Sequence, residues 1–304
     1  MLPLHDDNPT RRFPIVTLAI IALNALAFLL WEPTFASGTN QEKATKQVAF
    51  FYCHAEVPYE VSHQENLVEG GDEALQDLDE QNPIGPGSRE DYAAFQRFLR
   101  ERCPDKSWWQ SVFVAMFLHG GWLHIGGNML FLWIFGNNVE DKLGPLLYFL
   151  FYLGAGIAAS VGQLLVDTNS VVPNLGASGA IAGVLGAYIV MFPRRRVLTV
   201  VFLFFITFLW LPAWVVLGGW FILQLFNGVG AVTAHINSGV AFFAHIGGFV
   251  FGAALALLFF PKEGFGTRPP PPRPDSPWGR WGRRGGLGRG RRQLPPEQEV
   301  WRPY

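Results

Sequence analysis

Long stretches without charged side chains alternate with short polar segments along most of the chain. Between Ser107 and Pro261 charge occurs only at Glu140–Lys142, Asp167 and Arg194–Arg196. A soluble domain carries charge on every surface segment, whereas a helix that crosses about 30 Å of hydrocarbon needs about 20 predominantly apolar residues. The charge-free windows therefore predict membrane-spanning helices.

Six apolar windows reach or approach this length: Ile15–Trp31, Met116–Phe135, Leu146–Val166, Leu175–Phe192, Leu198–Phe226 and Gly239–Phe260. The fifth is too long for one span and too short for two. We interpret Leu198–Leu211 partly as an interfacial lead-in, with Pro212 in the first turn of the spanning helix, where proline is tolerated. The first window has no clear small-residue cleavage site after it, so we expect a retained helix and not a signal peptide. The pattern predicts an all-α polytopic membrane protein with six transmembrane helices.

The arginines near the window ends predict the orientation. Arg11 and Arg12 precede the first window, Arg194–Arg196 follow the fourth, and the tail from Lys262 holds ten Lys or Arg against four Asp or Glu. With six spans, these segments share one face, which the positive-inside rule makes cytoplasmic. We therefore expect both termini inside, with the second, fourth and sixth spans starting at the outer face.

The chain then divides into five parts. A cytoplasmic arm (1–13) and a first helix (14–32) precede an external acidic loop (33–110), and five further helices (111–261) precede a Pro/Gly/Arg-rich tail (262–304). We expect the tail to be disordered, because its composition cannot bury a core. Its arginines could contact anionic membrane lipid or could serve only as a positive-inside signal.

The external loop contains both cysteines of the chain. It has fourteen Asp or Glu against seven Lys or Arg, a net charge of −7, and includes Cys53 and Cys103. An oxidising exterior favours a disulfide between them, which would close a loop of about fifty residues. Two unpaired thiols are the alternative.

Polar side chains inside the windows are costly at membrane depth, so each calls for a partner or a function. The second window holds His119, His124 and Asn128, and the sixth holds His245. The fourth opens with Asn174, Gly176, Ser178 and Gly179. Because these three windows start outside, His124, Asn128, Ser178 and His245 can share one level near the outer face if the helices are neighbours. Ser178, Ala182 and Gly186 on one helix face, and Gly248 and Gly252 on another, would allow such close packing, although small residues are also common in ordinary membrane helices.

These residue types fit acyl-transfer chemistry. Ser178 needs a base to take its proton, and His245 can do so and then protonate a leaving amine. His124 and Asn128 lie four residues apart, on one helical face, and could donate hydrogen bonds to an oxyanion together with the Ser178 N–H at a helix N-terminus. Because the spans contain no Asp or Glu near these residues, the arrangement would be a dyad. Each residue alone could equally serve helix packing.

At these residues the chain resembles the rhomboid family of intramembrane serine proteases. The matching motifs are His119-xxxx-His124-xxx-Asn128, Gly176-Ala177-Ser178-Gly179 and Ala244-His245-xx-Gly248. The resemblance implies a six-helix rhomboid-like bundle, Ser178 as nucleophile, His245 as base, and His124 with Asn128 at the oxyanion site. It also implies cleavage of single-span membrane proteins near the outer surface, with no metal, cofactor or nucleic acid involved.

One position departs from the family pattern. Many members carry an aromatic residue four positions after the serine, under the catalytic imidazole, where this chain has Ala182. Phe242 or Phe243 could compensate. The alternative function is a non-catalytic rhomboid-like protein that binds or escorts transmembrane partners, although such proteins typically lack the catalytic residues. A transporter fits poorly because the polar cluster lies off-centre. Six spans with no appended seventh helix favour a bacterial plasma membrane.

Overall fold

A computed structural model of the chain describes residues 1–67, 97–103, 105–202, 205–234 and 239–260. The predicted tail, 262–304, and the middle of the external loop lie outside the described residues. The main helices follow the apolar windows: α1 (Ile15–Leu26) with η1 (Ala27–Trp31), α7 (Trp122–Phe131) with η3 (Leu132–Gly136) and α8 (Asn137–Leu143), α9 (Pro145–Leu164), α10 (Ser178–Met191), α11 (Ala213–Thr233) and α12 (Phe242–Phe259).

The outer faces of the long helices are apolar. Within the described part of the chain, α9, α11 and α12 are each long and apolar enough to cross a membrane, and Ile15–Trp31 and Ser178–Met191 are shorter apolar helices. Large exposed side chains on these helices include Leu150, Phe226 and Leu257. So much exposed apolar surface needs a lipid environment. The chain is therefore a helical, multi-pass membrane protein.

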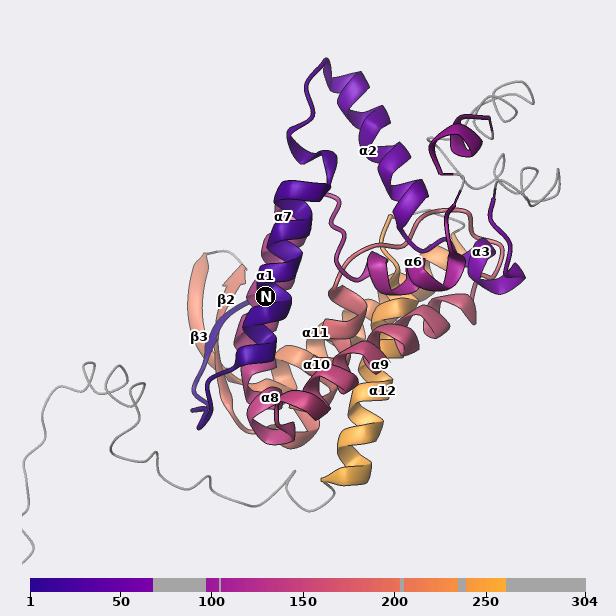
Figure 1. Cartoon of the computed structure of the whole chain (residues 1–304). Helices are drawn as coiled ribbons and strands as arrows, with labels where there is room; N and C mark the ends of the chain where they lie inside the picture. The colour runs from indigo at the N-terminus through magenta and orange to yellow at the C-terminus, as the bar shows by residue number, and fades with distance from the viewer. Residues whose placement is uncertain (68–96, 104, 203–204, 235–238, 261–304) are drawn as a thin grey trace, which may run out of the picture. The chain divides into compact units, whose positions relative to one another are not determined.

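Helix α10 lies at the centre of this bundle (Figure 1). Every residue from Gly179 to Tyr188 is buried, as expected for a helix that is hydrophobic on all sides. It contacts α12 through glycines: a methyl group added at Gly252 would lie 1.9 Å from the Gly183 carbonyl oxygen, and one added at Gly248 would lie 2.1 Å from that of Gly179. The predicted close packing of the two helices is present. Gly179 and Gly183 contribute to it, and so does the predicted Gly186, where an added methyl group would lie 2.0 Å from the Phe249 carbonyl oxygen.

The prediction of an all-α protein is wrong at one place. Leu198–Leu211 forms most of a hairpin, β2 (Arg196–Phe202) and β3 (Ile206–Pro212), and β1 (Leu2–Asp6) pairs with β2 to give an antiparallel sheet in the order β1-β2-β3. The hairpin is rich in β-branched and aromatic residues, which favour strands over helices. Pro212 ends β3 and is the N-cap of α11, so the spanning helix starts where the sequence predicts.

The N-terminal segment is tied to the bundle at two acidic residues. Asp6 Oδ2 accepts hydrogen bonds from the Tyr188 hydroxyl (2.6 Å) and from Asn138 Nδ2 (2.9 Å). The carboxylate of Glu140 accepts from the backbone N–H groups of Val16 and Thr17 at 2.9 and 2.8 Å. These N–H groups open α1 and have no partner inside the helix. The buried Glu140 thus caps α1 from α8.

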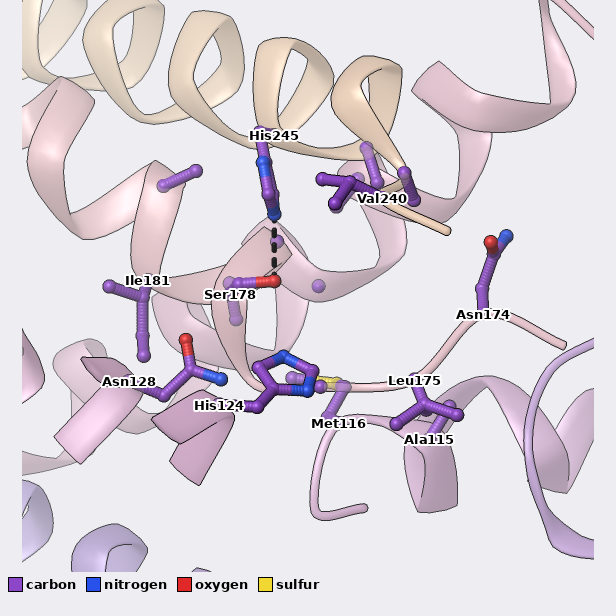
Figure 2. Close-up of a pocket in the computed structure, with 18 of the residues that line it drawn as sticks. Ala115, Met116, His124, Asn128, Asn174, Leu175, Ser178, Ile181, Val240 and His245 are labelled. Atoms are coloured by element: carbon purple, nitrogen blue, oxygen red, sulfur yellow. Dashed lines mark hydrogen bonds between the residues drawn. The ribbon is translucent and has the colours of Figure 1, made fainter. Parts of the chain in front are cut away.

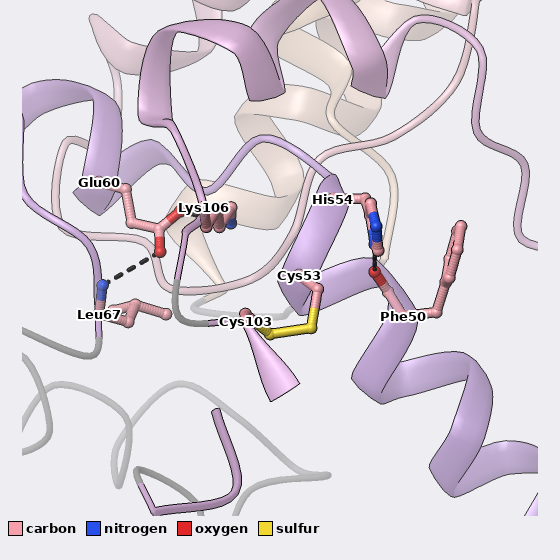
Figure 3. The surroundings of a disulfide bond; sticks show 7 residues. All are labelled: Phe50, Cys53, His54, Glu60, Leu67, Cys103 and Lys106. Atoms are coloured by element: carbon pink, nitrogen blue, oxygen red, sulfur yellow. Dashed lines mark hydrogen bonds and ion pairs between the residues drawn. A yellow bond between two sulfur atoms is a disulfide. The ribbon is translucent and has the colours of Figure 1, made fainter. Parts of the chain in front are cut away.

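The described part of the external loop is folded. It contains η2 (Pro33–Phe35), α2 (Asn40–His54) and α3 (Pro58–His63), followed after the undescribed residues by a short helical piece, 97–102, and by α6 (Trp108–Ala115). The structure contains the predicted disulfide between Cys53 and Cys103 (Figure 3). A small core of Tyr52, Val57, Leu67, Leu99 and Val171 surrounds it. Because Val171 belongs to the segment before α10, the external loop packs directly on the approach to Ser178.

Candidate active site

Ser178 is the first residue of α10 and is held by the segment before it. The N–H of Gly176 donates to the carbonyl of Ala115 (2.8 Å), and the N–H of Asn174 donates to the carbonyl of Glu56 (2.7 Å). Gly176 has φ +122°, a conformation that essentially only glycine adopts. These contacts orient the Gly-Ala-Ser-Gly turn, so the serine hydroxyl projects into a cavity at the helix N-terminus.

The hydroxyl of Ser178 meets the imidazole of His245. Ser178 Oγ and His245 Nε2 lie 2.8 Å apart, although the residues are 67 positions apart in the chain (Figure 2). His245 lies on the first turn of α12, just before the glycine contacts with α10. The close approach of the two backbones therefore places a nucleophile and a base within hydrogen-bond reach.

The second nitrogen of His245 also has a partner. Its Nδ1 lies 3.0 Å from Gln224 Oε1 on α11. The sequence predicts a base with no acidic residue to orient it, and within the described residues the partner is indeed an amide. Gln224 is visible in the sequence as a rare polar residue inside an apolar window, but the sequence does not say which helix it faces.

The aromatic neighbour of His245 is not one of those expected. Ala182 is buried and has no ring, and the ring centroid of Trp220 lies 5.8 Å from that of His245 with a tilt of 39°. Phe242 and Phe243 instead pack toward Gly228, where an added methyl group would lie 3.2 and 3.3 Å from them. The expected compensation by Phe242 or Phe243 is thus replaced by Trp220 from α11.

His124 and Asn128 lie on one face of α7, on the opposite side of Ser178 from His245 (Figure 2). His124 Nδ1 accepts a hydrogen bond from the N–H of Gly120 (3.3 Å), so in the neutral ring Nε2 carries the proton and can donate. A methyl group added at Gly176 would lie 2.7 Å from His124 Nε2 and 3.6 Å from Ser178 Oγ. Asn128 Nδ2 is buried without a partner among the described residues. Two donors therefore border the space beside the serine.

His119, the remaining polar residue of this motif, lies behind the site. It is fully buried, and its ring centroid is 5.1 Å from that of His124 in an edge-to-face contact. Its backbone N–H donates to Glu32 Oε1 (2.9 Å). His119 does not line the cavity, so it packs against His124 and fixes the start of α7.

A cavity of about 400 Å³ contains these groups. It is lined by residues of α7, α9, α10, α11 and α12, including Ser178, His245, His124, Asn128, Trp220 and Gln224. Glu56 of the external loop also lines the cavity, and its carboxylate accepts a hydrogen bond from the Ser160 hydroxyl on α9. Burial raises the pKa of Glu56 to about 7. No sequence pattern relates this loop residue to the cavity, and sequence reasoning missed it.

In the described part of the chain, no three His, Cys, Asp or Glu side chains are close enough together to hold a metal ion. The polar side-chain groups that line the cavity include the Ser178 hydroxyl, two imidazoles, amide groups and the carboxyl group of Glu56. With one imidazole as base and separate donors near the hydroxyl, the arrangement suits attack on a carbonyl carbon.

Comparisons with known proteins match the part of the chain that contains the cavity residues of α7, α10 and α12. The Rhomboid domain model matches residues 105–262, a region that includes Ser178, His245, His124 and Asn128. The chain is 40% identical over 96 residues to Rhomboid protein 1, mitochondrial, of Saccharomyces cerevisiae, covering 30% of this chain and 28% of that protein.

Two bacterial relatives from Bacillus subtilis are also similar. The chain is 35% identical over 166 residues to Rhomboid protease GluP, covering 53% of this chain and 28% of that protein. It is 33% identical over 84 residues to Putative rhomboid protease YdcA, covering 28% and 41%. The chain thus spans less than half the length of each of these relatives.

Proposed function

The chain belongs to the rhomboid family, and from this premise we propose that it is an intramembrane serine endopeptidase that cleaves transmembrane proteins. The observation that carries the proposal is the 2.8 Å contact between Ser178 Oγ and His245 Nε2 inside a cavity. Two named proteases among the relatives, GluP and YdcA, support it.

The proposed reaction proceeds through an acyl-enzyme. Ser178 Oγ attacks the substrate carbonyl carbon while His245 Nε2 takes the hydroxyl proton. The carbonyl oxygen becomes an oxyanion, which His124 Nε2–H and Asn128 Nδ2–H meet as preorganised donors, with the N–H of Ser178 at the N-terminus of α10. The C–N bond then breaks, and His245 returns the proton to the leaving amine. A water molecule, activated by His245, releases the second product and restores the serine.

We propose six spans for this protease. In addition to α9, α11 and α12, which have the full length, the spans are Ile15–Trp31, the continuous helix from Trp122 to Leu143, and α10. The short α10 is enclosed by other helices and needs no contact with lipid. The arginine distribution supports cytoplasmic termini, with the cavity near the outer face. The six-span layout favours a bacterial plasma membrane.

The proposed substrates are single-span membrane proteins. A helical peptide bond is not accessible to Ser178, so the substrate must unwind locally to present a carbonyl. Glycine or proline in the substrate helix should favour cleavage, because both weaken helical structure. The 400 Å³ cavity is large enough for side chains on both sides of the scissile bond.

A reconstitution experiment tests the proposal. The purified protein in liposomes is given a fluorescent model transmembrane substrate, and wild type is compared with Ser178→Ala, His245→Ala and the control Ser62→Ala in the external loop. We expect Ser178→Ala and His245→Ala to lose about 10⁴-fold or more in kcat, as is usual for a nucleophile or its base. The control should match wild type.

A fluorophosphonate probe gives a second readout that needs no substrate. It should label wild type covalently and leave Ser178→Ala unlabelled. Equal product from all four proteins, or equal labelling of wild type and Ser178→Ala, would contradict the protease proposal. Substrate binding without cleavage in that case would indicate a protein that escorts transmembrane partners.

A further inference from the structure

We propose that Gln224 is a positioning residue that holds the imidazole of His245 in the orientation and tautomer of a general base, with Trp220 supporting the ring face. This inference rests on the proposed protease function. It assigns to helix α11 the task that an acidic residue performs in a Ser-His-Asp triad.

The hydrogen bonds of the imidazole carry the inference. Nδ1 lies 3.0 Å from Gln224 Oε1 and Nε2 lies 2.8 Å from Ser178 Oγ. An amide oxygen can only accept, so Nδ1 must be the protonated nitrogen when it faces Oε1. Nε2 then has a free lone pair directed at the serine hydroxyl. This is the tautomer that can take the proton of Ser178.

The membrane setting explains why an amide suits this position. An ionised carboxylate buried in an apolar environment carries a large desolvation cost unless it is well paired. The glutamine supplies an acceptor for Nδ1–H without adding a charge. It can therefore orient the base while the resting site stays neutral.

Trp220 acts from the same face of α11. It precedes Gln224 by four residues, so the two side chains are neighbours on the helix surface. Its ring centroid lies 5.8 Å from that of His245, whereas Ala182 has no ring to support the imidazole. The edge of the imidazole is thus held by Gln224 and one face is bordered by Trp220, so both restraints come from α11.

Few other groups that titrate face His245. Among the described residues that line its cavity, the other titratable ones are His124 on α7 and Glu56 of the external loop. The lining residues of α9, α10, α11 and α12 include no Asp, Glu, Lys or Arg. A charge introduced at position 224 would therefore dominate the electrostatics at Nδ1.

The test compares Gln224→Leu and Gln224→Glu with a matched control, Gln163→Leu, which makes the same change on α9 outside the cavity lining. A general base contributes about 10²–10⁴-fold to the rate, so a misoriented one should lower kcat of Gln224→Leu by about 10- to 100-fold with little change in KM. The control should keep the wild-type kcat. Thermal unfolding of each variant establishes that it is folded.

The glutamate variant gives a readout that a purely structural role would not change. A carboxylate beside Nδ1 favours the protonated imidazole, so the acidic limb of the pH–rate profile of Gln224→Glu should move to higher pH. At alkaline pH the variant should be more active than Gln224→Leu. If Gln224→Leu does not fold, the pH–rate profile of Gln224→Glu tests the role of Gln224 by itself.

A spectroscopic measurement separates this inference from the proposed function. ¹⁵N NMR of histidine-labelled protein, with His245→Ala to assign the signal, reports which ring nitrogen carries the proton. Wild type should show the proton on Nδ1, and Gln224→Leu a mixture. A proton on Nε2 in wild type, or an unchanged kcat in Gln224→Leu, overturns the role of Gln224. If the wild type neither cleaves substrate nor reacts with the fluorophosphonate, the protease proposal is overturned. The protonated ring nitrogen of His245 still tests the contact with Gln224 in that case.

Discussion

Because Gly176 has no side chain, the donor His124 and the nucleophile Ser178 can lie close together. Its φ of +122° allows the chain to turn into α10, and its missing side chain lets His124 Nε2 approach Ser178. Both the backbone conformation and the space depend on the absence of Cβ. At the residue scale, this glycine has as large a part in the geometry of the site as the polar side chains around it.

Gly176→Ala should therefore impair catalysis. An alanine would be strained by about 1–3 kcal/mol at this φ, and its methyl group would lie 2.7 Å from His124 Nε2. We expect kcat to fall by about 10²-fold or more, the usual effect of displacing one oxyanion donor, as measured on the reconstituted substrate. Gly219→Ala on α11, where an added methyl group meets nothing within 4 Å, is the control. Equal kcat for the two variants would contradict a role of Gly176 in placing His124 beside Ser178.

At the scale of elements, the contact between α10 and α12 decides whether the dyad can form. The backbones approach so closely that methyl groups at Gly248 and Gly252 would collide with carbonyl oxygens of Gly179 and Gly183. Small residues at such a crossing allow tight van der Waals packing, which drives helix association in membranes. Ser178 and His245 lie at the end of this crossing where α10 and α12 begin.

Gly252→Ala should separate the two helices. The added carbon would lie 1.9 Å from the Gly183 oxygen, and overpacking of this kind costs about 1–3 kcal/mol. We expect a lower unfolding temperature in detergent and a lower kcat, because the Ser178–His245 hydrogen bond lengthens. A fluorophosphonate labelling rate equal to that of wild type would show that the crossing does not set the dyad distance.

At the scale of the whole molecule, Glu56 connects the external loop to the membrane bundle. Its carbonyl accepts from Asn174 and its side chain from Ser160. Close by, Lys106 and Glu60 form a buried ion pair (Figure 3). The disulfide between Cys53 and Cys103 links α2 to the segment before α6. Hydrogen bonds of Glu56 therefore fasten the loop to the segment before α10 and to α9. The disulfide and the ion pair hold the segments of the loop to one another.

Stability should depend on pH through Glu56. Burial raises its pKa from 4.5 to about 7, so between these values the folded state binds more protons than the unfolded state. The free energy of unfolding must then fall as pH rises through this window. Above pH 7 the loss of unfolding free energy approaches about 3 kcal/mol, at about 1.36 kcal/mol per pKa unit.

Unfolding temperatures measured from pH 4.5 to 8 check this prediction. The unfolding temperature of Glu56→Gln should fall less steeply with pH than that of the wild type. The control Glu101→Gln, at an exposed position, should give the same curve as the wild type. Some decline should remain in Glu56→Gln, because burial also raises the pKa of Asp6 to about 7. Parallel curves for wild type and Glu56→Gln would exclude Glu56 as the source.

The apolar helices and the polar residues that line the cavity could be predicted because the membrane restricts the possibilities. Hydrocarbon requires long apolar segments, so the helices appear as charge-free windows, and polar side chains within them are rare enough that Ser178 and His245 stand out. The disulfide was also predictable, because both cysteines lie in one external segment. The hairpin at Arg196–Pro212 was missed, because a short apolar run fits a strand as well as a helix.

What the sequence determined by itself was which residues can do chemistry and on which helices they lie, since bilayer thickness and the cost of burying polar groups act locally. Which of these residues meet depends on how the helices and the loop pack together. The partnership of His245 with Gln224 and Trp220 depends on the rotation of α11 against α12, and the entry of Glu56 into the cavity depends on how the external loop packs. Both follow from packing between segments far apart in the chain, which no local pattern specifies.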